Sequence, residues 1–228
     1  HVNIPPFNEN ANYDPVRDFT HVTLAAQNFG QALVVHPDVP AKNLQELIAY
    51  ASKNPGKLTY ANAGNGTASH IPAEVMKTMT STDILSIPYK GIGEATTDLI
   101  AGRVDIFFVG TQIALQHVQS GKLRALAITG ERRWKGLPDV PTLEEMGLKG
   151  VDIGTWFGVL APAGVPMPIV NRLHATLARA LQSQDMKDRL TAEGGEPIGS
   201  NPQAFYEFIK SEIERWAVVV KASGMKAE

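Results

Sequence analysis

The sequence has no cysteine among its 228 residues. This absence excludes a disulfide framework and any zinc site built on thiolates. No apolar run approaches the roughly 20 residues needed to cross a bilayer. An excess of one charge is also lacking, because 21 lysine and arginine residues nearly balance 23 aspartate and glutamate residues. This balance argues against attraction to nucleic acid or to an anionic membrane surface.

What is present is typical of a globular chain with a hydrophobic core. Hydrophobic residues make up 43% and charged residues 19%, and the length suits one large domain or two small ones. The sequence has no signal peptide and opens at His1 rather than at methionine. Such an opening is typical of a processed, tagged or truncated product, which is compatible with a secreted origin.

The order of apolar and breaker-rich segments predicts an α/β fold. Two apolar runs within residues 19–35 are expected to be strands, and Asn43 with Glu46 has the spacing of a capping box that begins a helix. Strands and helices then alternate with short connections, which predicts a parallel sheet covered on both faces. The expected strands are 58–63, 84–88, 104–109 and 123–129, and the expected helices lie near 70–79, 93–101 and 112–119.

The C-terminal part is expected to be mostly helical. A short helix ending at Gly147 and a strand at 155–161 come first, and Asn201 before Pro202 then predicts a helix start. Apolar residues form two stripes at helical spacing. The first stripe comprises Ile169, Leu173, Leu177 and Leu181; the second comprises Phe205, Phe208, Ile209, Ile213, Trp216 and Val220.

This pattern predicts two domains. Residues 30–153 form one compact α/β domain, and the flanks 1–29 and 154–228 together form a second, discontinuous one. Two chain crossings join the domains, near Asn28–Gly30 and near Gly154.

One glycine-rich turn follows a strand and precedes a helix. It reads Gly64-Asn65-Gly66-Thr67-Ala68-Ser69. Free N–H groups at a helix start, together with the helix dipole, favour a bound anion. Proline has no N–H, so Pro72 is expected in the first helical turn; this favours Ser69 over Thr67 as the cap and leaves the Thr67 hydroxyl for a ligand. The alternative is that the glycines only allow a tight turn.

More specific motifs do not fit this turn. A phosphate-binding P-loop needs a lysine that is absent, and the dinucleotide fingerprint needs glycine or alanine where Ser69 stands. The Gly-x-Ser-x-Gly elbow of hydrolases occurs nowhere. The six histidines are scattered without metal-binding spacing, so neither a metal nor a cofactor is expected.

Two further turns follow the second and third strands expected in the alternating block. Tyr89-Lys90-Gly91 follows strand 84–88, and Gly110-Thr111-Gln112 follows strand 104–109. Ligands of open parallel sheets bind beyond the carboxyl ends of strands, where the strand order reverses. If 58–63 and 104–109 are neighbours, the 64–69 and 110–112 turns meet there. These turns offer donors and glycines but no poised nucleophile or base, which suits holding an anion better than transforming one.

Several segments together resemble the Bug solute receptors, the TctC-like substrate-binding proteins of tripartite tricarboxylate transporters. The similarity runs from residue 12 to residue 222 in unbroken order. The segments that carry it read NYDPVRDFTHVT, VVHPDVPAKNLQELIAYASKNPGKLTYANAGNGTASH, IPYKG, DLIAGRVDIFF, SGKLRALAITG, LPDVPTLEEMG and GVLAPAGVP.

The resemblance implies a periplasmic, two-lobed receptor of the Venus-flytrap kind (type II periplasmic-binding-protein fold), with lobe 1 formed by 1–29 and 154–228 and lobe 2 by 30–153. Such a receptor captures a small carboxylate and delivers it to membrane permease subunits; it has no catalytic residue, cofactor or nucleic-acid partner. The turn at 64–70 matches the family's ligand turn. The candidate ligand-binding residues are therefore Gly64, Asn65, Gly66, Thr67, Ser69, His70, Gly110, Thr111 and His1.

The sequence departs from the family pattern at two places. It has no counterpart to the family's N-terminal strand–helix–strand portion with its Pro-Gly-Gly turn. Lobe 1 is therefore expected to be incomplete, with apolar surface left for self-association or for a missing segment. The family often has Phe-Asp-Asn where this chain has Phe108-Val109-Gly110. Losing that aspartate removes a negative charge expected at the rim of the site, which favours a plain dicarboxylate over an amino acid.

Two other functions stay open on this sequence. One is the ligand-sensing effector domain of a transcription regulator, which shares the two-lobed architecture but needs a helix-turn-helix module that is not in these 228 residues. The other is an α/β enzyme whose catalytic residues lie on an absent N-terminal portion.

Overall fold

The computed structural model describes residues 12–223 except Asn65, Glu131, Gly150, Asp152, Ile153 and Glu193. Contacts divide the chain into two compact units. Unit 1 comprises residues 1–28 and 156–228, and unit 2 comprises residues 29–155. The chain thus passes from one unit to the other twice, at 28/29 and at 155/156. The limits expected from the sequence, 29/30 and 153/154, lie close to these two positions.

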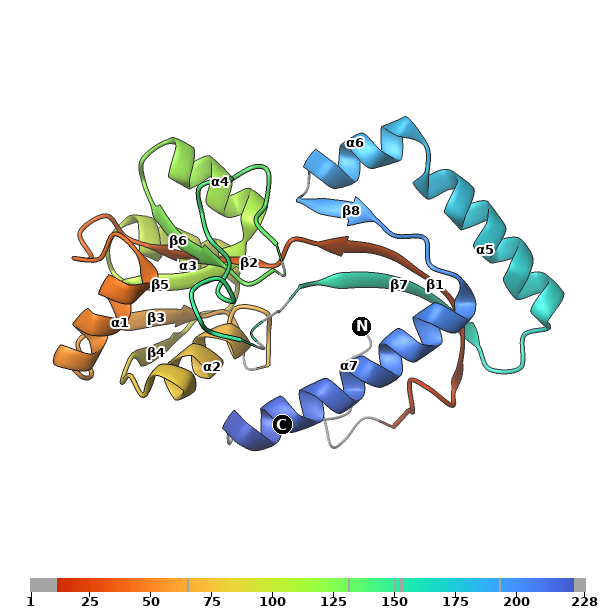
Figure 1. Cartoon of the computed structure of the whole chain (residues 1–228), viewed down its shortest axis with the longest axis horizontal. Coiled ribbons are helices and arrows are strands. Elements are labelled where there is room, and N and C mark those ends of the chain that lie inside the picture. Colours follow the sequence, from red (N-terminus) through yellow and green to blue (C-terminus); the bar gives the residue numbers. More distant parts are fainter. Residues whose placement is uncertain are drawn as a thin grey trace. The chain divides into compact units, whose positions relative to one another are not determined.

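Unit 2 is built on a five-stranded sheet with helices packed against it (Figure 1). The strands lie in the order β4-β3-β5-β2-β6. They are β2 (Gln31–Val35), β3 (Thr59–Asn62), β4 (Leu85–Pro88), β5 (Ile106–Gly110) and β6 (Arg124–Ile128), and the helices are α1 (Leu44–Lys53), α2 (Ile71–Thr80), α3 (Ile92–Ile100) and α4 (Thr111–Gln119).

The sheet is mixed rather than wholly parallel. The four strands of the alternating segment run in one direction, as predicted, because β3 pairs in parallel with β4 and β5 and because β5 and β6 both pair antiparallel with β2. The prediction is wrong for β2, which lies antiparallel between β5 and β6. The chain enters β2 directly from unit 1 rather than through a crossover helix, so nothing forces it into the common direction.

Local signals placed helices α1 to α4 correctly. The Asn43 side chain accepts a hydrogen bond from the Glu46 N–H at 2.9 Å, and the Glu46 carboxylate accepts one from the Lys42 N–H at 2.7 Å, which confirms a cap at the start of α1. The core on one face joins α3 and α4 to the sheet. Its buried members are Ala32, Val34, Ala61, Ala95, Leu99, Val104, Phe107, Val109, Ala114 and Leu123.

The helix expected to end at Gly147 is a wrong prediction. Thr142 and Glu145 do form a reciprocal cap, with Thr142 N–H donating to the Glu145 carboxylate at 2.9 Å and Glu145 N–H donating to the Thr142 hydroxyl at 3.1 Å. Gly147 follows with a φ of 90°. A left-handed glycine so soon after the cap ends the helical pattern within one turn, and the segment remains a set of turns.

Unit 1 is built on a three-stranded antiparallel sheet in the order β7-β1-β8. The strands are β1 (Phe19–Asn28), β7 (Trp156–Pro162) and β8 (Gly195–Pro197), and the helices are α5 (Met167–Leu181), α6 (Gln184–Ala192) and α7 (Pro202–Ser223). Strand β8 was not predicted, because three residues that include glycine and proline carry no strand pattern.

The two apolar stripes of the C-terminal helices differ in burial. Asn201 caps α7 as predicted, since its side chain accepts a hydrogen bond from the Ala204 N–H at 2.8 Å. On α7 the buried stripe residues are Phe205, Ile209 and Trp216, whereas the Val220 side chain lies outside the described ones. On α5, Ile169 and Leu173 are 52% and 42% exposed. The first stripe therefore faces the core only in part.

Candidate functional site

The connection between β3 and α2 is a tight turn that requires glycine at two positions. Gly64 and Gly66 have φ values of 127° and 70°, which L-residues rarely adopt. The Asn62 side chain accepts a hydrogen bond from the Gly64 N–H at 3.0 Å. This contact turns the chain immediately after the strand.

The hydroxyl groups of Thr67 and Ser69 close this turn on itself. Thr67 Oγ1 donates to the Gly64 carbonyl at 2.7 Å and lies 2.9 Å from Ser69 Oγ. Because the single Thr67 hydroxyl proton goes to the carbonyl, Ser69 is the donor in the hydroxyl pair. The predicted Ser69 cap is wrong, since α2 begins after His70 without any side-chain cap. The Thr67 hydroxyl is not free either, because the local carbonyl takes its proton.

Two backbone donors of the turn are unsatisfied. The N–H groups of Ala68 and Ser69 form no hydrogen bond with any described residue, and Ser69 is buried. Pro72 lies in the first turn of α2, as predicted, and has no N–H to offer. Unsatisfied donors at the positive end of a helix dipole favour a bound anion.

His70 is held in one tautomer by the same turn. The Gly66 N–H donates to His70 Nδ1 at 3.2 Å, so the ring proton sits on Nε2. The ring stacks on Tyr60 at a centroid distance of 6.5 Å. Burial lowers the pKa of His70, and the negative charge of Glu74 opposes this only in part. The side chain is therefore a neutral donor through Nε2 at neutral pH.

A short network holds the ring on which His70 stacks. Glu74 Oε1 accepts hydrogen bonds from the Tyr60 hydroxyl at 2.6 Å and from Lys77 Nζ at 2.7 Å. Burial alone would raise the pKa of Glu74, but the bonds from Lys77 and Tyr60 outweigh it and lower that pKa. Burial and the bond to Glu74 raise the pKa of Tyr60. The carboxylate thus fixes Tyr60 and, through it, the turn.

The second predicted turn lies at the same edge of the sheet. Strands β3 and β5 are parallel neighbours, with Tyr60 opposite Ile106, which confirms the adjacency on which the prediction depended. Their carboxyl ends therefore meet at one edge, where β3 leads through α2 to β4 on one side and β5 leads through α4 to β6 on the other. This is the switch point at which open α/β sheets bind ligands.

At the end of β5, Gly110 and Thr111 begin α4. Gly110 has a φ of −51° and no side-chain cap, and a Cβ at this position would meet nothing within 4 Å. Thr111 is buried, and its hydroxyl forms no hydrogen bond with the described part of the chain. Val109, by contrast, packs in the apolar core of unit 2. Its side chain therefore lies on no exposed rim, contrary to the expectation, because strand alternation turns it toward α4.

The structure adds Lys90 to the candidates; the sequence placed it in the Tyr89-Lys90-Gly91 turn but not among the ligand-binding residues. Lys90 follows β4, the other parallel neighbour of β3, and the Tyr89 N–H before it donates to the Asn62 carbonyl at 2.8 Å. Lys90 is exposed and forms no ion pair with a described residue. The signal for it was a lysine placed between the end of a strand and a helix start at Gly91.

Two predicted site residues, His1 and Asn65, lie outside the described ones. Within the described ranges no group of three or more histidine, aspartate or glutamate side chains could hold a metal ion. None of the helices described is long and apolar enough to cross a membrane. The arrangement at this edge therefore offers backbone donors, one neutral histidine and one lysine, a set suited to an anion.

Comparisons with known proteins all point to one family. The profile described as "Tripartite tricarboxylate transporter family receptor" (TctC) matches residues 1–225. The first three curated relatives are 33% to 36% identical, and the chain spans only 62% to 66% of their length.

Three solved structures share the fold closely. "R. palustris Rpa4515 with adipate" is 35% identical, with a TM-score of 0.83 over 95% of this chain and 72% of that one. "Structure of periplasmic binding protein BugD" is 33% identical, with a TM-score of 0.85 over 99% and 76%. "MatC (Rpa3494) from Rhodopseudomonas palustris with bound malate" is 32% identical, with a TM-score of 0.78 over 94% and 74%. The chain has the α/β fold of periplasmic binding proteins, and it belongs to the TctC family of tripartite tricarboxylate transporter receptors, which includes the Bug proteins.

Proposed function

We propose that this chain is the ligand-binding part of a periplasmic receptor that captures a small dicarboxylate at the sheet edge of unit 2. The two unsatisfied N–H groups of Ala68 and Ser69 carry this proposal. They would receive one carboxylate, with His70 Nε2–H and Lys90 as further donors at the same edge. We propose also that units 1 and 2 are the two lobes of the receptor.

A dicarboxylate is the class that the relatives favour. Two of the similar structures, those of Rpa4515 and MatC, are complexes with adipate and with malate, and both ligands are dicarboxylates. Backbone donors bind the carboxylate group and make few contacts with the rest of the ligand. The chain length and the substituents of the ligand are therefore left to parts of the protein beyond this turn.

Binding of adipate, malate and citrate to the 228-residue chain, measured by calorimetry, tests the proposal. Lys90→Ala should weaken dicarboxylate binding by about threefold to tenfold, because an exposed ionic contact is worth roughly 1 kcal/mol. Lys122→Ala is the matched control, because Lys122 is also exposed but precedes β6, at the opposite edge of the sheet. A folded chain that binds none of the three acids, or equal losses in both variants, would contradict the proposed site.

The ligand is expected to be released unchanged. Ser69 Oγ is hydrogen-bonded to the Thr67 hydroxyl and the Ala63 N–H rather than to a base, and His70 Nδ1 is occupied by a backbone N–H. A nucleophile without a base in contact is not activated. Incubating the bound acid with the chain and following it by proton NMR separates a receptor from an enzyme, since only an enzyme would convert the acid.

Delivery to membrane permease subunits, and a periplasmic location, are part of the same proposal and rest on the family. Self-association through unit 1 stays a prediction. Five large apolar residues in the described part of this unit are exposed, which supports it: Phe157, Met167, Ile169, Leu173 and Ile198. Sedimentation of the chain over a range of concentrations measures it directly.

A further inference from the structure

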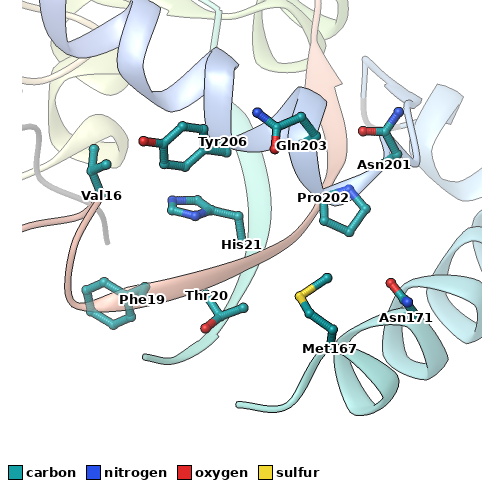
Figure 2. A pocket seen from close by; sticks show the side chains of 10 residues that line it. All are labelled: Val16, Phe19, Thr20, His21, Met167, Asn171, Asn201, Pro202, Gln203 and Tyr206. Atoms are coloured by element: carbon teal, nitrogen blue, oxygen red, sulfur yellow. The ribbon is translucent and has the colours of Figure 1, made fainter. Parts of the chain in front are cut away.

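Unit 1 contains a cavity of about 450 Å³ that is separate from the candidate site in unit 2. It lies where the starts of β1, α5 and α7 come together (Figure 2). Its volume falls within the range of small-molecule pockets. The lining residues are Val16, Phe19, Thr20, His21, Met167, Asn171, Asn201, Pro202, Gln203 and Tyr206.

His21 gives this cavity a fixed hydrogen-bond acceptor. The residue is only 6% exposed, and Nε2 lies 3.1 Å from the Pro15 carbonyl. A carbonyl can only accept, so Nε2 carries the proton and Nδ1 presents a lone pair. Nδ1 forms no hydrogen bond with any residue that the structure describes. Burial lowers the pKa of His21, although the hydrogen bond to Pro15 has the opposite effect. The ring is therefore neutral at neutral pH.

The orientation of this ring is set by its aromatic neighbours. The rings of Phe205 and Tyr206 meet it edge to face at centroid distances of 5.8 Å and 5.2 Å. Figure 2 shows Tyr206 and His21 side by side at one end of the cavity. The acceptor is therefore held in place before any ligand arrives, which lowers the cost of ordering it on binding.

Two more polar groups of the lining have no hydrogen-bond partner in the described part of the chain. The Tyr206 hydroxyl and the Asn171 amide form no hydrogen bond within the described ranges. The other polar side chains are engaged: Thr20 donates to the Pro162 carbonyl, Asn201 caps the Ala204 N–H and Gln203 donates to Glu207. The cavity therefore offers one acceptor on a largely buried ring and two groups able to donate.

None of the ten lining side chains carries a formal charge when His21 is neutral. An ionised carboxylate would find no cation among these lining side chains, and its oxygens would face the lone pair of Nδ1. Val16, Phe19, Met167 and Pro202 supply apolar surface around the polar groups. The chemistry is thus opposite to that of the edge proposed for the dicarboxylate.

We propose that this cavity is a second binding site, for an uncharged molecule that carries a hydroxyl group on an apolar body, such as a phenol or a cyclic alcohol. The ligand hydroxyl donates to His21 Nδ1, and its oxygen accepts from Tyr206 or Asn171. Its apolar body packs against Phe19 and Met167. The site is independent of the carboxylate site and of the proposed receptor function.

Three probes on the full 228-residue chain separate the elements of this proposal. Phenol carries both the ring and the donor, anisole has the ring without the donor, and benzoate replaces the hydroxyl by a charge. Nitrogen NMR of the His21 ring at neutral pH is expected to show a saturable shift of the Nδ1 resonance with phenol. Anisole and benzoate should bind at least about tenfold more weakly, because each lacks the donor for Nδ1. No saturable shift with phenol, or equal binding of anisole, would overturn the proposal.

A matched pair of variants locates the site. Met167 and Ile169 are 54% and 52% exposed on the same turn of α5, but only Met167 lines the cavity. Met167→Glu should weaken phenol binding by at least about tenfold, whereas Ile169→Glu should leave it within about twofold. Tyr206→Phe keeps the ring on His21 and should weaken binding through loss of the hydroxyl alone. Equal losses in both glutamate variants, or unchanged binding in Met167→Glu, would place the probe elsewhere and refute the assignment.

Discussion

Replacing Gly66 by alanine tests how tightly the turn before α2 is specified. Gly66 has a φ of 70°, and its N–H donates to His70 Nδ1 at 3.2 Å. Holding an L-residue in the left-handed region costs about 1–2 kcal/mol. The lower entropy of the unfolded alanine chain offsets about 0.4–1 kcal/mol of that cost. We expect Gly66→Ala to lower the free energy of unfolding by roughly 1 kcal/mol, a loss of about 2–4 °C in melting temperature for a chain of this size.

Gly110→Ala is the control for this experiment. Gly110 has a φ of −51°, and a Cβ there would meet nothing within 4 Å, so alanine should change stability by less than about 0.5 kcal/mol. Urea unfolding followed by circular dichroism measures both variants. If Gly66→Ala unfolds at the same urea concentration as the parent chain, the turn is not held in the left-handed conformation and the His70 tautomer argument fails.

The same Gly110→Ala variant should nonetheless weaken dicarboxylate binding, because its methyl group enters open space beside the start of α4; calorimetry that shows parent affinity would remove Gly110 from the site. Gly158→Ala should destabilise unit 1 by about 1–3 kcal/mol, since its Cβ would clash with the Phe205 ring; Gly93→Ala, in open space within α3, should be neutral or stabilising in the same melt. The lowered pKa of Glu74 means that its contribution to stability is present above its unfolded pKa of 4.5 and is lost as the pH falls through its folded pKa. Glu74→Gln should flatten that part of a stability-against-pH curve, and an unchanged slope would show that the Lys77 and Tyr60 bonds do not hold the carboxylate ionised.

Much of unit 2 followed from local sequence. The Asn43 cap and the alternation of strands and helices were predictable, because capping and apolar periodicity act over a few residues. The glycine turn between β3 and α2 was predictable for the same reason, since two glycines and a helix start lie together in the chain.

The predictions for Ser69 and for the apolar stripe of α5 failed because local sequence does not determine which partner a side chain contacts. Ser69 was expected to cap α2, yet its hydroxyl pairs with Thr67, and the cap position falls to His70. Ile169 and Leu173 lie on an apolar stripe but remain exposed, because helical spacing shows which residues share a face and not what covers that face.

The sequence by itself determined the α/β class, the family and the turn that offers donors to an anion. These depend on short-range patterns and on an unbroken run of similarity. Only the tertiary structure decided the direction of β2, the His70 tautomer, the place of Lys90 beside β3 and the cavity around His21. Each of these depends on residues far apart in the chain, which come together only when the sheets pair and the helices pack, and the sequence pattern carries no record of that geometry.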